Sequence, residues 1–307
     1  MNRLLIPLLA LCLSGVAIAQ ARAEGRDNID IHCGNCKKWN AAQKPFNVVA
    51  NTWYVGTTEL SSVLVTGPGG HILIDGALPQ SVPQIEANIK ALGFRVRDIK
   101  VIVSSHPHFD HAGGIAQLAR DSGAAVMASA AGARVLRAGV IGSDDPQYEI
   151  SRNTHFPRVD KVRVIADGEV IAVGPIKLTA HMTPGHTPGG ASYTWQSCQR
   201  ESCVDVAYLD SLNPASSDGY TYSGGAGRPN IVPAFEASIA KVSALKCDVA
   251  LSAHPDFTDT LDKLAARTSE HNTFIDSNGC KAYAADAKAR LSKRIEIERQ
   301  QKAAAAK

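Results

Sequence analysis

The sequence lacks a long run of basic residues and a large net charge of either sign. Its 32 lysines and arginines nearly balance 29 aspartates and glutamates, giving a formal net charge of +3. Because affinity for a nucleic-acid backbone comes mainly from clustered positive charge, this balance argues against nucleic acid as a partner. Internal repeats and breaks in composition are also absent from residues 45–295. Apolar side chains make up 45% of the 307 residues, which excludes a disordered chain and favours one sizeable domain.

The N-terminal residues lack an apolar stretch long enough for a membrane-spanning helix. Residues 4–19 are apolar but interrupted, and they fall short of the roughly 20 residues that such a helix needs. Small-residue cleavage patterns follow, so we expect a signal peptide over residues 1–23, cleaved after Ala19 or Ala23. The mature protein would then be periplasmic, with no membrane anchor. The alternatives are a retained anchor and a lipoprotein signal at Cys12, although a leucine precedes that cysteine where such signals have a small residue.

The number of cysteines in the full chain is odd, because there are seven. Removal of the one in the leader leaves six, and in an oxidising compartment the simplest pairing joins neighbours along the chain. The predicted disulfides are therefore Cys33–Cys36, Cys198–Cys203 and Cys247–Cys280, although other pairings remain open. For the first pair the alternative is a redox or zinc motif, but the second such pair that a zinc ribbon needs is missing.

The spacing of apolar residues predicts a mixed α/β chain. We expect strands at residues 51–55, 62–66, 71–75, 100–103, 125–128, 161–165, 169–173, 176–181, 191–194, 205–209 and 248–252. We expect helices at residues 80–92, 113–121, 130–138 and 231–245, and helical structure from residue 261 onward. The charged, alanine-rich residues 296–307 are expected to form a solvated or frayed tail.

Histidine is sparse, ten residues in all, yet three histidines and an aspartate fall within the segment His106-Pro107-His108-Phe109-Asp110-His111. This segment follows a predicted strand, and so do His186 and His254. Strand ends gather at one edge of a sheet, so these side chains are expected to meet. Imidazoles and a carboxylate in this pattern are typical of zinc sites. A catalytic zinc ion has three protein ligands and an open position for water, so the six ligands would suit two zinc ions. Chance clustering in a polar loop is the alternative.

The motif His-x-His-x-Asp-His, with the later Pro184-Gly185-His186-Thr187 and the late His254, resembles the metallo-β-lactamase superfamily. Other stretches between about residues 51 and 289 resemble its subclass B3: NTWYVGT at 51–57, HILIDG at 71–76, DHAGG at 110–114 and YLDSL at 208–212. Ser211 stands where the other di-zinc subclasses are expected to have a cysteine ligand. The resemblance implies one domain over residues 24–295, folded as a four-layer αβ/βα sandwich with the metal site between two sheets.

The resemblance also implies individual roles. One zinc ion would be bound by His106, His108 and His186, and a second by Asp110, His111 and His254. Ser211 would bond a metal water, Asp110 would also hold the proton of the attacking water, and Asp75 would orient the ligand loop. A plain turn residue is the alternative for Asp75. The disulfides Cys198–Cys203 and Cys247–Cys280 are implied as well.

The implied activity is hydrolysis of the β-lactam amide bond in penicillins, cephalosporins and carbapenems, which confers antibiotic resistance. Two zinc ions per chain would lower the pKa of a bound water to roughly 7, so that hydroxide attacks and no acyl-enzyme forms. The only expected partner is a small-molecule substrate, and the chain is expected to be a monomer. One alternative is a thioesterase of the glyoxalase II kind or a lactonase, in which an aspartate, here Asp210, bridges both metals. A non-catalytic zinc-binding protein is the other.

Two long polar stretches without a period, residues 139–158 and 213–229, are expected to form loops over the site and to select the substrate. The candidates for lining the groove are Glu59, Tyr148, His155, Phe156, Asn213 and Tyr220. A carboxylate of Glu59 at the mouth would disfavour anionic substrates. Asn213 stands where several members of the family have a serine that contacts the substrate carboxylate. Both departures are expected to change substrate affinity rather than catalysis.

Overall fold

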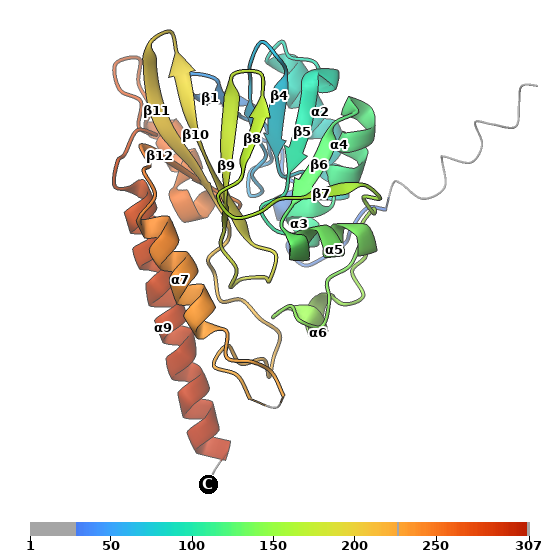
Figure 1. The fold of residues 1–307 in the computed structure, drawn as a ribbon, viewed down its shortest axis with the longest axis vertical. Helices are drawn as coiled ribbons and strands as arrows, with labels where there is room; N and C mark the ends of the chain where they lie inside the picture. Colours follow the sequence, from blue (N-terminus) through green and yellow to red (C-terminus); the bar gives the residue numbers. More distant parts are fainter. Residues whose placement is uncertain (1–28, 226, 306–307) are drawn as a thin grey trace, which may run out of the picture.

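Two β-sheets packed face to face form the centre of the computed structural model, which describes residues 29–225 and 227–305 (Figure 1). The expected signal peptide therefore lies outside the described residues. The first sheet has the order β1-β2-β3-β4-β5-β6-β7 and the second the order β12-β11-β10-β9-β8. The strands of the first sheet are β1 (Phe46–Val49), β2 (Thr52–Tyr54), β3 (Val63–Val65), β4 (His71–Ile74), β5 (Ile99–Val103), β6 (Ala125–Ala128) and β7 (Val162–Val164). Those of the second are β8 (Val170–Val173), β9 (Ile176–Met182), β10 (Ala191–Gln199), β11 (Ser202–Leu209) and β12 (Val249–Ser252).

Helices cover the outer face of each sheet. The first sheet is covered by α2 (Val82–Ala91), α4 (Ile115–Ser122) and α5 (Ala130–Ala138), and the second by α7 (Val232–Ser243) and α9 (Gly279–Ala305) (Figure 1). Short helices are α1 (Cys36–Trp39), α3 (Phe109–Ala112), α6 (Tyr148–Ser151) and α8 (Thr260–Ala266), with 3₁₀ turns at Pro79–Ser81, Val96–Asp98 and Pro255–Thr258. The four-layer αβ/βα sandwich predicted from the sequence is confirmed.

The central strands are apolar on both faces, which explains why their sequences read as continuous hydrophobic runs. In β5, Ile102 packs toward the helices of its own sheet, whereas Val101 and Val103 pack between the two sheets. In β4, Leu73 likewise packs toward the helices, and Ile72 packs between the two sheets. Successive side chains of a strand point to opposite faces, so a strand buried on both faces cannot alternate with polar residues. Each sheet thereby contributes to two core layers.

All three disulfides join the predicted neighbours: Cys33–Cys36, Cys198–Cys203 and Cys247–Cys280. The second links β10 to β11 at directly paired positions of an antiparallel hairpin. This hairpin is longer than the predicted strands 191–194 and 205–209, because its outer part carries polar side chains that hide the strand period. The third disulfide joins the segment before β12 to the first turn of α9.

The C-terminal part of the chain differs most from the predictions. Helical structure is not continuous from residue 261, because residues 267–278 form turns between α8 and α9. Residues 296–305, expected to form a solvated or frayed tail, are the last turns of α9. Residues 296–304 are exposed apart from Glu298, which is fully buried. The strand β1 was not predicted at all. Short or polar segments of this kind receive their structure from tertiary contacts rather than from local preference.

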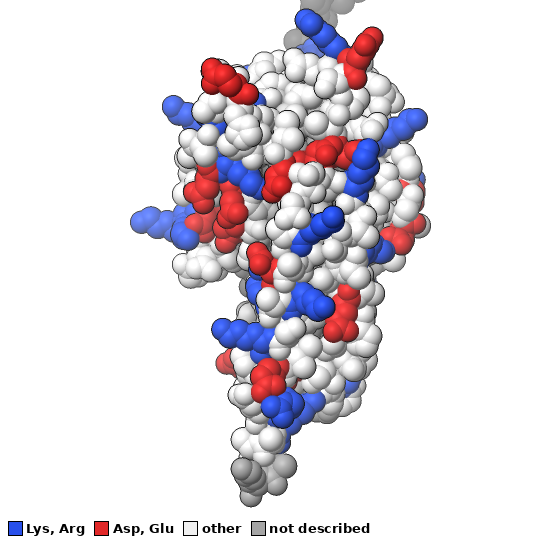
Figure 2. All heavy atoms as spheres, turned by 90° about the vertical axis from the view of Figure 1, so that its left-hand side faces the viewer, with Lys and Arg blue, Asp and Glu red and all other residues white. Residues whose placement is uncertain are grey.

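The surface carries charges of both signs. On the face shown in Figure 2, basic and acidic side chains are interspersed, in keeping with the balanced composition. Within residues 29–225 and 227–305, no helix combines the length and the apolar character required to cross a membrane.

Candidate metal centre

The six predicted ligands come from loops at one edge of the two sheets. His106 and His108 lie in the extended segment after β5, and Asp110 and His111 lie in α3, which follows at once. His186 lies in the turn between β9 and β10, and His254 directly follows β12. The backbone N–H of Ala191 donates to the carbonyl of Ser105 at 2.7 Å, which ties the start of β10 to the ligand segment.

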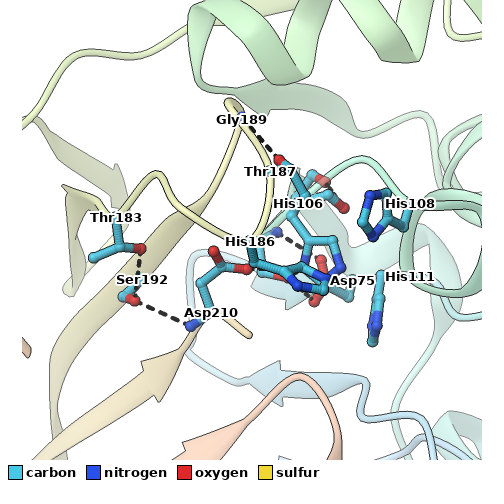
Figure 3. A network of polar contacts seen from close by, with 12 residues as sticks. Asp75, His106, His108, His111, Thr183, His186, Thr187, Gly189, Ser192 and Asp210 are labelled. Atoms are coloured by element: carbon cyan, nitrogen blue, oxygen red, sulfur yellow. Dashed lines mark hydrogen bonds and ion pairs between the residues drawn. The ribbon is translucent and has the colours of Figure 1, made fainter. Parts of the chain in front are cut away.

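Asp75 fixes the start of the ligand segment from the end of β4. Its Oδ1 accepts a hydrogen bond from the backbone N–H of Ser105 at 2.7 Å. Its Oδ2 accepts from the Ser105 hydroxyl at 2.6 Å and from the Tyr208 hydroxyl at 2.8 Å. The carboxyl is completely buried, and burial raises its pKa although these donors and His111 oppose the shift. Asp75 therefore does more than form a turn, because it joins β4, β11 and the ligand segment (Figure 3).

The donor atoms form two compact groups, which we call the first and the second donor group. The first contains His106, His108 and His186, and the second contains Asp110, His111 and His254. Within each group the donor atoms lie within 4.8 Å of one another. In the second group, His111 Nε2 lies 3.2 Å from His254 Nε2 and 3.3 Å from Asp110 Oδ2. These are the two sets of three that the sequence predicted.

Most of the histidines are oriented through the ring nitrogen that points away from the centre. The outer contacts are His106 Nδ1 to Asp210 Oδ1 at 2.8 Å, His108 Nε2 to Asp145 Oδ2 at 3.1 Å, His186 Nδ1 to the Asn213 carbonyl at 2.7 Å and His254 Nδ1 to the Glu59 carbonyl at 3.1 Å. For His108, His186 and His254 these carboxylate and carbonyl acceptors fix the tautomer of the imidazole. Asp210 Oδ1 lies close to His106 Nδ1 without forming a hydrogen bond. The opposite nitrogens are thereby left for a metal.

One buried ring nitrogen indicates that the site fits a metal. Among the described residues, His106 Nε2 has no hydrogen-bond partner, although the side chain is completely buried. A buried polar atom without a partner is costly, and a metal ion would satisfy it. Five imidazoles and one carboxylate are the donor types that zinc accepts. The residues present therefore fit a metal site.

The electrostatics of the site favour the metal-binding forms of His106, His186 and Asp110, but not that of His108. Burial, reinforced by the neighbouring imidazoles, lowers the pKa of His106 well below its usual range and that of His186 to about 3. Burial raises the pKa of Asp110, but His111 and the other histidines outweigh it and hold this pKa well below its usual range. Asp145 has the opposite effect on His108, whose pKa is raised despite its burial. Neutral imidazoles and ionised carboxylates are the ligand forms that metals require.

Asp210 lies behind His106 rather than between the two donor groups. Its Oδ1 contacts the outer nitrogen of His106, and it belongs to neither group of converging donor atoms. A Cβ atom at Gly190 would overlap its Oδ2, so a glycine is required for this approach. The next residue, Ser211, lines the cavity, and its buried Oγ has no hydrogen-bond partner among the described residues. Figure 3 shows Asp210 together with His106, His108, His111 and His186.

Both donor groups open into a cavity of about 530 Å³. Its remaining wall comes from Phe109 in α3 and from four other segments: Cys33, Gly34, Asn35 and Trp39; Gln147, Ile150 and Ser151; Asn213 and Ala215; and Asp256 and Phe257 after β12. The two loops predicted to cover the site, residues 139–158 and 213–229, therefore both contribute to it.

Of the candidates for substrate contact, only Asn213 lines this cavity in the described part of the chain. Phe156 is buried in the core under α5, Tyr148 packs against that core, and Tyr220 is buried beside Tyr222. His155 is exposed outside the cavity, and the Glu59 carboxylate pairs with Lys38 at 2.5 Å. Both predicted loops thus contribute to the cavity wall, whereas the large aromatic residues Tyr148, Phe156 and Tyr220 pack within the protein.

Several lining and orienting residues escaped the sequence analysis. Gln147 Nε2 lies 3.4 Å from His108 Nδ1 and 3.5 Å from His186 Nε2, and Asp145 binds the other side of His108. Neither residue has a spacing signal, because it lies in a loop without a period. Trp39 was also missed, although its ring centroid lies 5.9 Å from that of His254. Its position directly after the paired cysteines was the available clue.

Comparisons with known proteins agree on the family. The family model described as "Metallo-beta-lactamase superfamily" matches residues 56–199. The solved structure of Rm3 metallo-beta-lactamase is 47% identical with a TM-score of 0.84, and the match covers 88% of this chain and 100% of that one. MEM-A1, a subclass B3 metallo-beta-lactamase from a soil metagenome library, is 45% identical with a TM-score of 0.83, covering 86% and 99%.

A curated relative gives a weaker match to a different activity. Hydroxyacylglutathione hydrolase of Anaeromyxobacter dehalogenans is 31% identical over 133 residues, which is 43% of this chain. The chain spans only 41% of the length of that relative.

Proposed function

We propose that this chain, which belongs to the metallo-β-lactamase superfamily and groups with its subclass B3 enzymes, hydrolyses the amide bond of β-lactam antibiotics. The observation that carries this proposal is the pair of donor groups that open together into one cavity beside Ser211. A cavity of about 530 Å³ has the size of sites for drug-sized ligands. Penicillins, cephalosporins and carbapenems are the proposed substrates, and antibiotic resistance is the proposed biological role.

The proposed cofactor is two zinc ions, one in each donor group. His106, His108 and His186 would hold the first, and Asp110, His111 and His254 the second. When bound, zinc supplies a water of lowered pKa and a Lewis acid for the lactam carbonyl.

The remaining chemistry comes from the side chains of the protein. Asp110, ionised and buried at the edge of the cavity, is placed to hold the proton released when water attacks. Asn213 presents its side chain on the opposite loop, where its amide can hydrogen-bond a substrate carboxylate. Asp75 keeps the ligand segment in place during turnover through its bonds to Ser105.

Direct attack by water, without an acyl-enzyme, is supported by the surroundings of Ser211. A nucleophilic serine needs a general base within hydrogen-bond distance. The buried Oγ of Ser211 has no such partner among the residues that the structure describes. This hydroxyl is instead available to hydrogen-bond a water in the centre, which is the role that we assign to it.

Thioester hydrolysis is the second candidate, because the curated relative is a hydroxyacylglutathione hydrolase. In the thioesterase alternative, Asp210 would be a ligand shared by both metals. Here the Asp210 carboxylate contacts the outer nitrogen of His106 and is absent from both donor groups. This position favours lactam hydrolysis over the thioesterase reaction.

An assay with the purified mature protein separates the two activities. We expect the zinc-loaded protein to open a carbapenem and a chromogenic cephalosporin, and a chelator to abolish both reactions. A glutathione thioester and a homoserine lactone serve as the competing substrates. Cleavage of either of these with both lactams left intact would overturn the proposed function.

Export to the periplasm as a monomer completes the proposal. The expected signal peptide over residues 1–23 and the three disulfides both suit an oxidising compartment. N-terminal sequencing of the protein recovered from the periplasm should begin at Gln20 or Glu24. A protein that starts at Met1, or that remains with the membrane, would contradict this part of the proposal.

A further inference from the structure

The two loops over the cavity are hydrogen-bonded to each other, and we call residues 139–158 and 213–225 together the loop arch. The contact is made by Ser217, which is only 3% exposed. Its backbone N–H donates to the carbonyl of Pro146 at 2.9 Å, and its Oγ accepts from the backbone N–H of Ile150 at 3.1 Å. A movement of one loop therefore displaces the other.

Each half of the arch orients one histidine of the first donor group. In the first loop, the Asp145 carboxylate accepts a hydrogen bond from His108 Nε2. The same carboxylate also accepts one from the backbone N–H of Gln147 at 2.8 Å. In the second loop, the backbone carbonyl of Asn213 accepts a hydrogen bond from His186 Nδ1 at 2.7 Å. The arch thus fixes two of the three donors for the first metal.

The far end of the arch is held by the last turns of α9, which extend past the second sheet beside the loop before α7 (Figure 1). Glu298 is fully buried there, and its two carboxylate oxygens accept from the backbone N–H groups of Tyr222 at 2.8 Å and Ser223 at 3.0 Å. The guanidinium of Arg294 donates to Glu298 at 2.9 Å and also to the carbonyl of Tyr220. A buried charge with this many donors is a fixed anchor rather than a surface ion pair.

A further hydrogen bond connects this anchor to the cavity wall. The hydroxyl of Tyr222 donates to the carbonyl of Ala215 at 2.8 Å, and Ala215 lines the cavity two residues after Asn213. Glu298 is therefore connected through Tyr222 to the segment that orients His186.

We propose that Glu298 is a positioning residue for the first donor group and acts through the loop arch. The second group does not depend on it, since Asp110 and His111 lie in α3 and His254 is held by the carbonyl of Glu59. Loss of the anchor should therefore weaken the first metal site selectively. This inference rests on the proposed function, in which the first donor group holds zinc.

The test compares Glu298→Gln with Glu296→Gln in the full mature protein. Glu296 lies on the same helix but pairs with Arg299 on the exposed surface, so its substitution controls for the loss of a carboxylate. Zinc titration against a chelating dye gives the dissociation constants of both sites, and hydrogen exchange of the metal-free protein reports on the backbone of residues 213–225.

For Glu298→Gln we expect about a 10-fold weaker first site, as for loss of other groups that orient metal ligands, with the second site unchanged. We also expect faster exchange in residues 213–225 and a rise in KM larger than the fall in kcat. Glu296→Gln should match the wild type in each measurement. If both variants bind zinc and exchange like the wild type, Glu298 has no positioning role. Equal weakening of both sites would overturn the selectivity and with it the proposal.

A second variant keeps the test decisive if Glu298→Gln fails to fold. Ser217→Ala removes only the acceptor for Ile150 and leaves α9 untouched. We expect a weaker first site and faster exchange in both loops, and wild-type behaviour in this variant would count against the arch. Because neither zinc binding nor exchange requires turnover, the result is independent of whether the wild type opens β-lactams.

Discussion

The two donor groups of the metal centre are built in different ways. Each group takes two donors from the short segment 106–111 and one from farther along the chain, His186 or His254. The donors of the first group have three contacts with other segments, namely with Asp210, Asp145 and the carbonyl of Asn213. Among the described residues, the second group has one such contact, between His254 and the carbonyl of Glu59. A short motif thus supplies most of the donors of both groups, whereas the orientation of the first group depends on more tertiary contacts than that of the second.

The largest effect should come from removing one donor of each group in turn. We expect His186→Ala to lose the first zinc and nearly all lactam hydrolysis, and His254→Ala to lose the second zinc. Metal analysis of each purified variant, with circular dichroism as the control for folding, checks the assignment. Two zinc ions retained by His186→Ala would show that the donor groups are drawn wrongly.

A smaller but selective effect is expected from Asp145→Asn. The amide cannot accept from His108 as the carboxylate does, and loss of such a partner weakens metal binding about 10- to 100-fold. The control is Asp144→Asn, because Asp144 is the neighbouring residue but pairs with Arg134 on the surface. Competition with a chelating dye should show a weaker first site only for Asp145→Asn, and equal affinities in the two variants would contradict the outer contact.

A weaker first site, together with a loss of stability, is expected when Tyr222→Phe removes a single hydroxyl. The hydrogen bond through which the Glu298 anchor reaches Ala215 is lost. A neutral hydrogen bond contributes on the order of 1 kcal/mol to the free energy of unfolding. Denaturant unfolding measures this difference, and the loss of zinc affinity should be smaller than for Asp145→Asn. An unchanged first site here would show that the anchor does not act through this hydroxyl.

The smallest effect is expected from Glu59→Gln. The contact with His254 is made by the backbone carbonyl of Glu59, which the substitution preserves, and the side chain only pairs with exposed Lys38. Exposed ion pairs contribute little, so KM for any β-lactam should change less than about twofold. A large and salt-dependent fall in KM would instead show that the carboxylate repels anionic substrates, as the sequence suggested.

The same contrast explains how much the sequence could predict. Most of the strands and the gathering of histidines at strand ends follow from local patterns, such as the apolar run of β5 followed by His106 and His108. The four layers and the division of the donors into two sets were implied by the family resemblance. Contacts such as Asp145 with His108, or Glu298 with Tyr222, join residues far apart in the chain, and nothing in their local spacing identifies them. They can be found only once the elements have been packed.

The residues that line the cavity could not be predicted from the sequence either. Phe156 and Tyr220 are the large residues that loop sequences make conspicuous, yet both are used to pack the loops. Gln147 and Ile150, which do line the cavity, have no spacing that distinguishes them from their neighbours in the loop. Which side of a loop faces a site depends on its tertiary contacts, so residue type alone could not separate the two sets.

The burial of Glu298 has a consequence for the way in which genes of this kind are judged. All six donors precede residue 255, so a gene cut short before the last turns of α9 would still encode the complete motif. Its product would lack the acceptor for Tyr222 and Ser223, and hence the anchor of the loop arch. A frameshift near the 3′ end could therefore reduce resistance in a strain that a motif search scores as a carrier, and the reading frame should be checked to its stop codon.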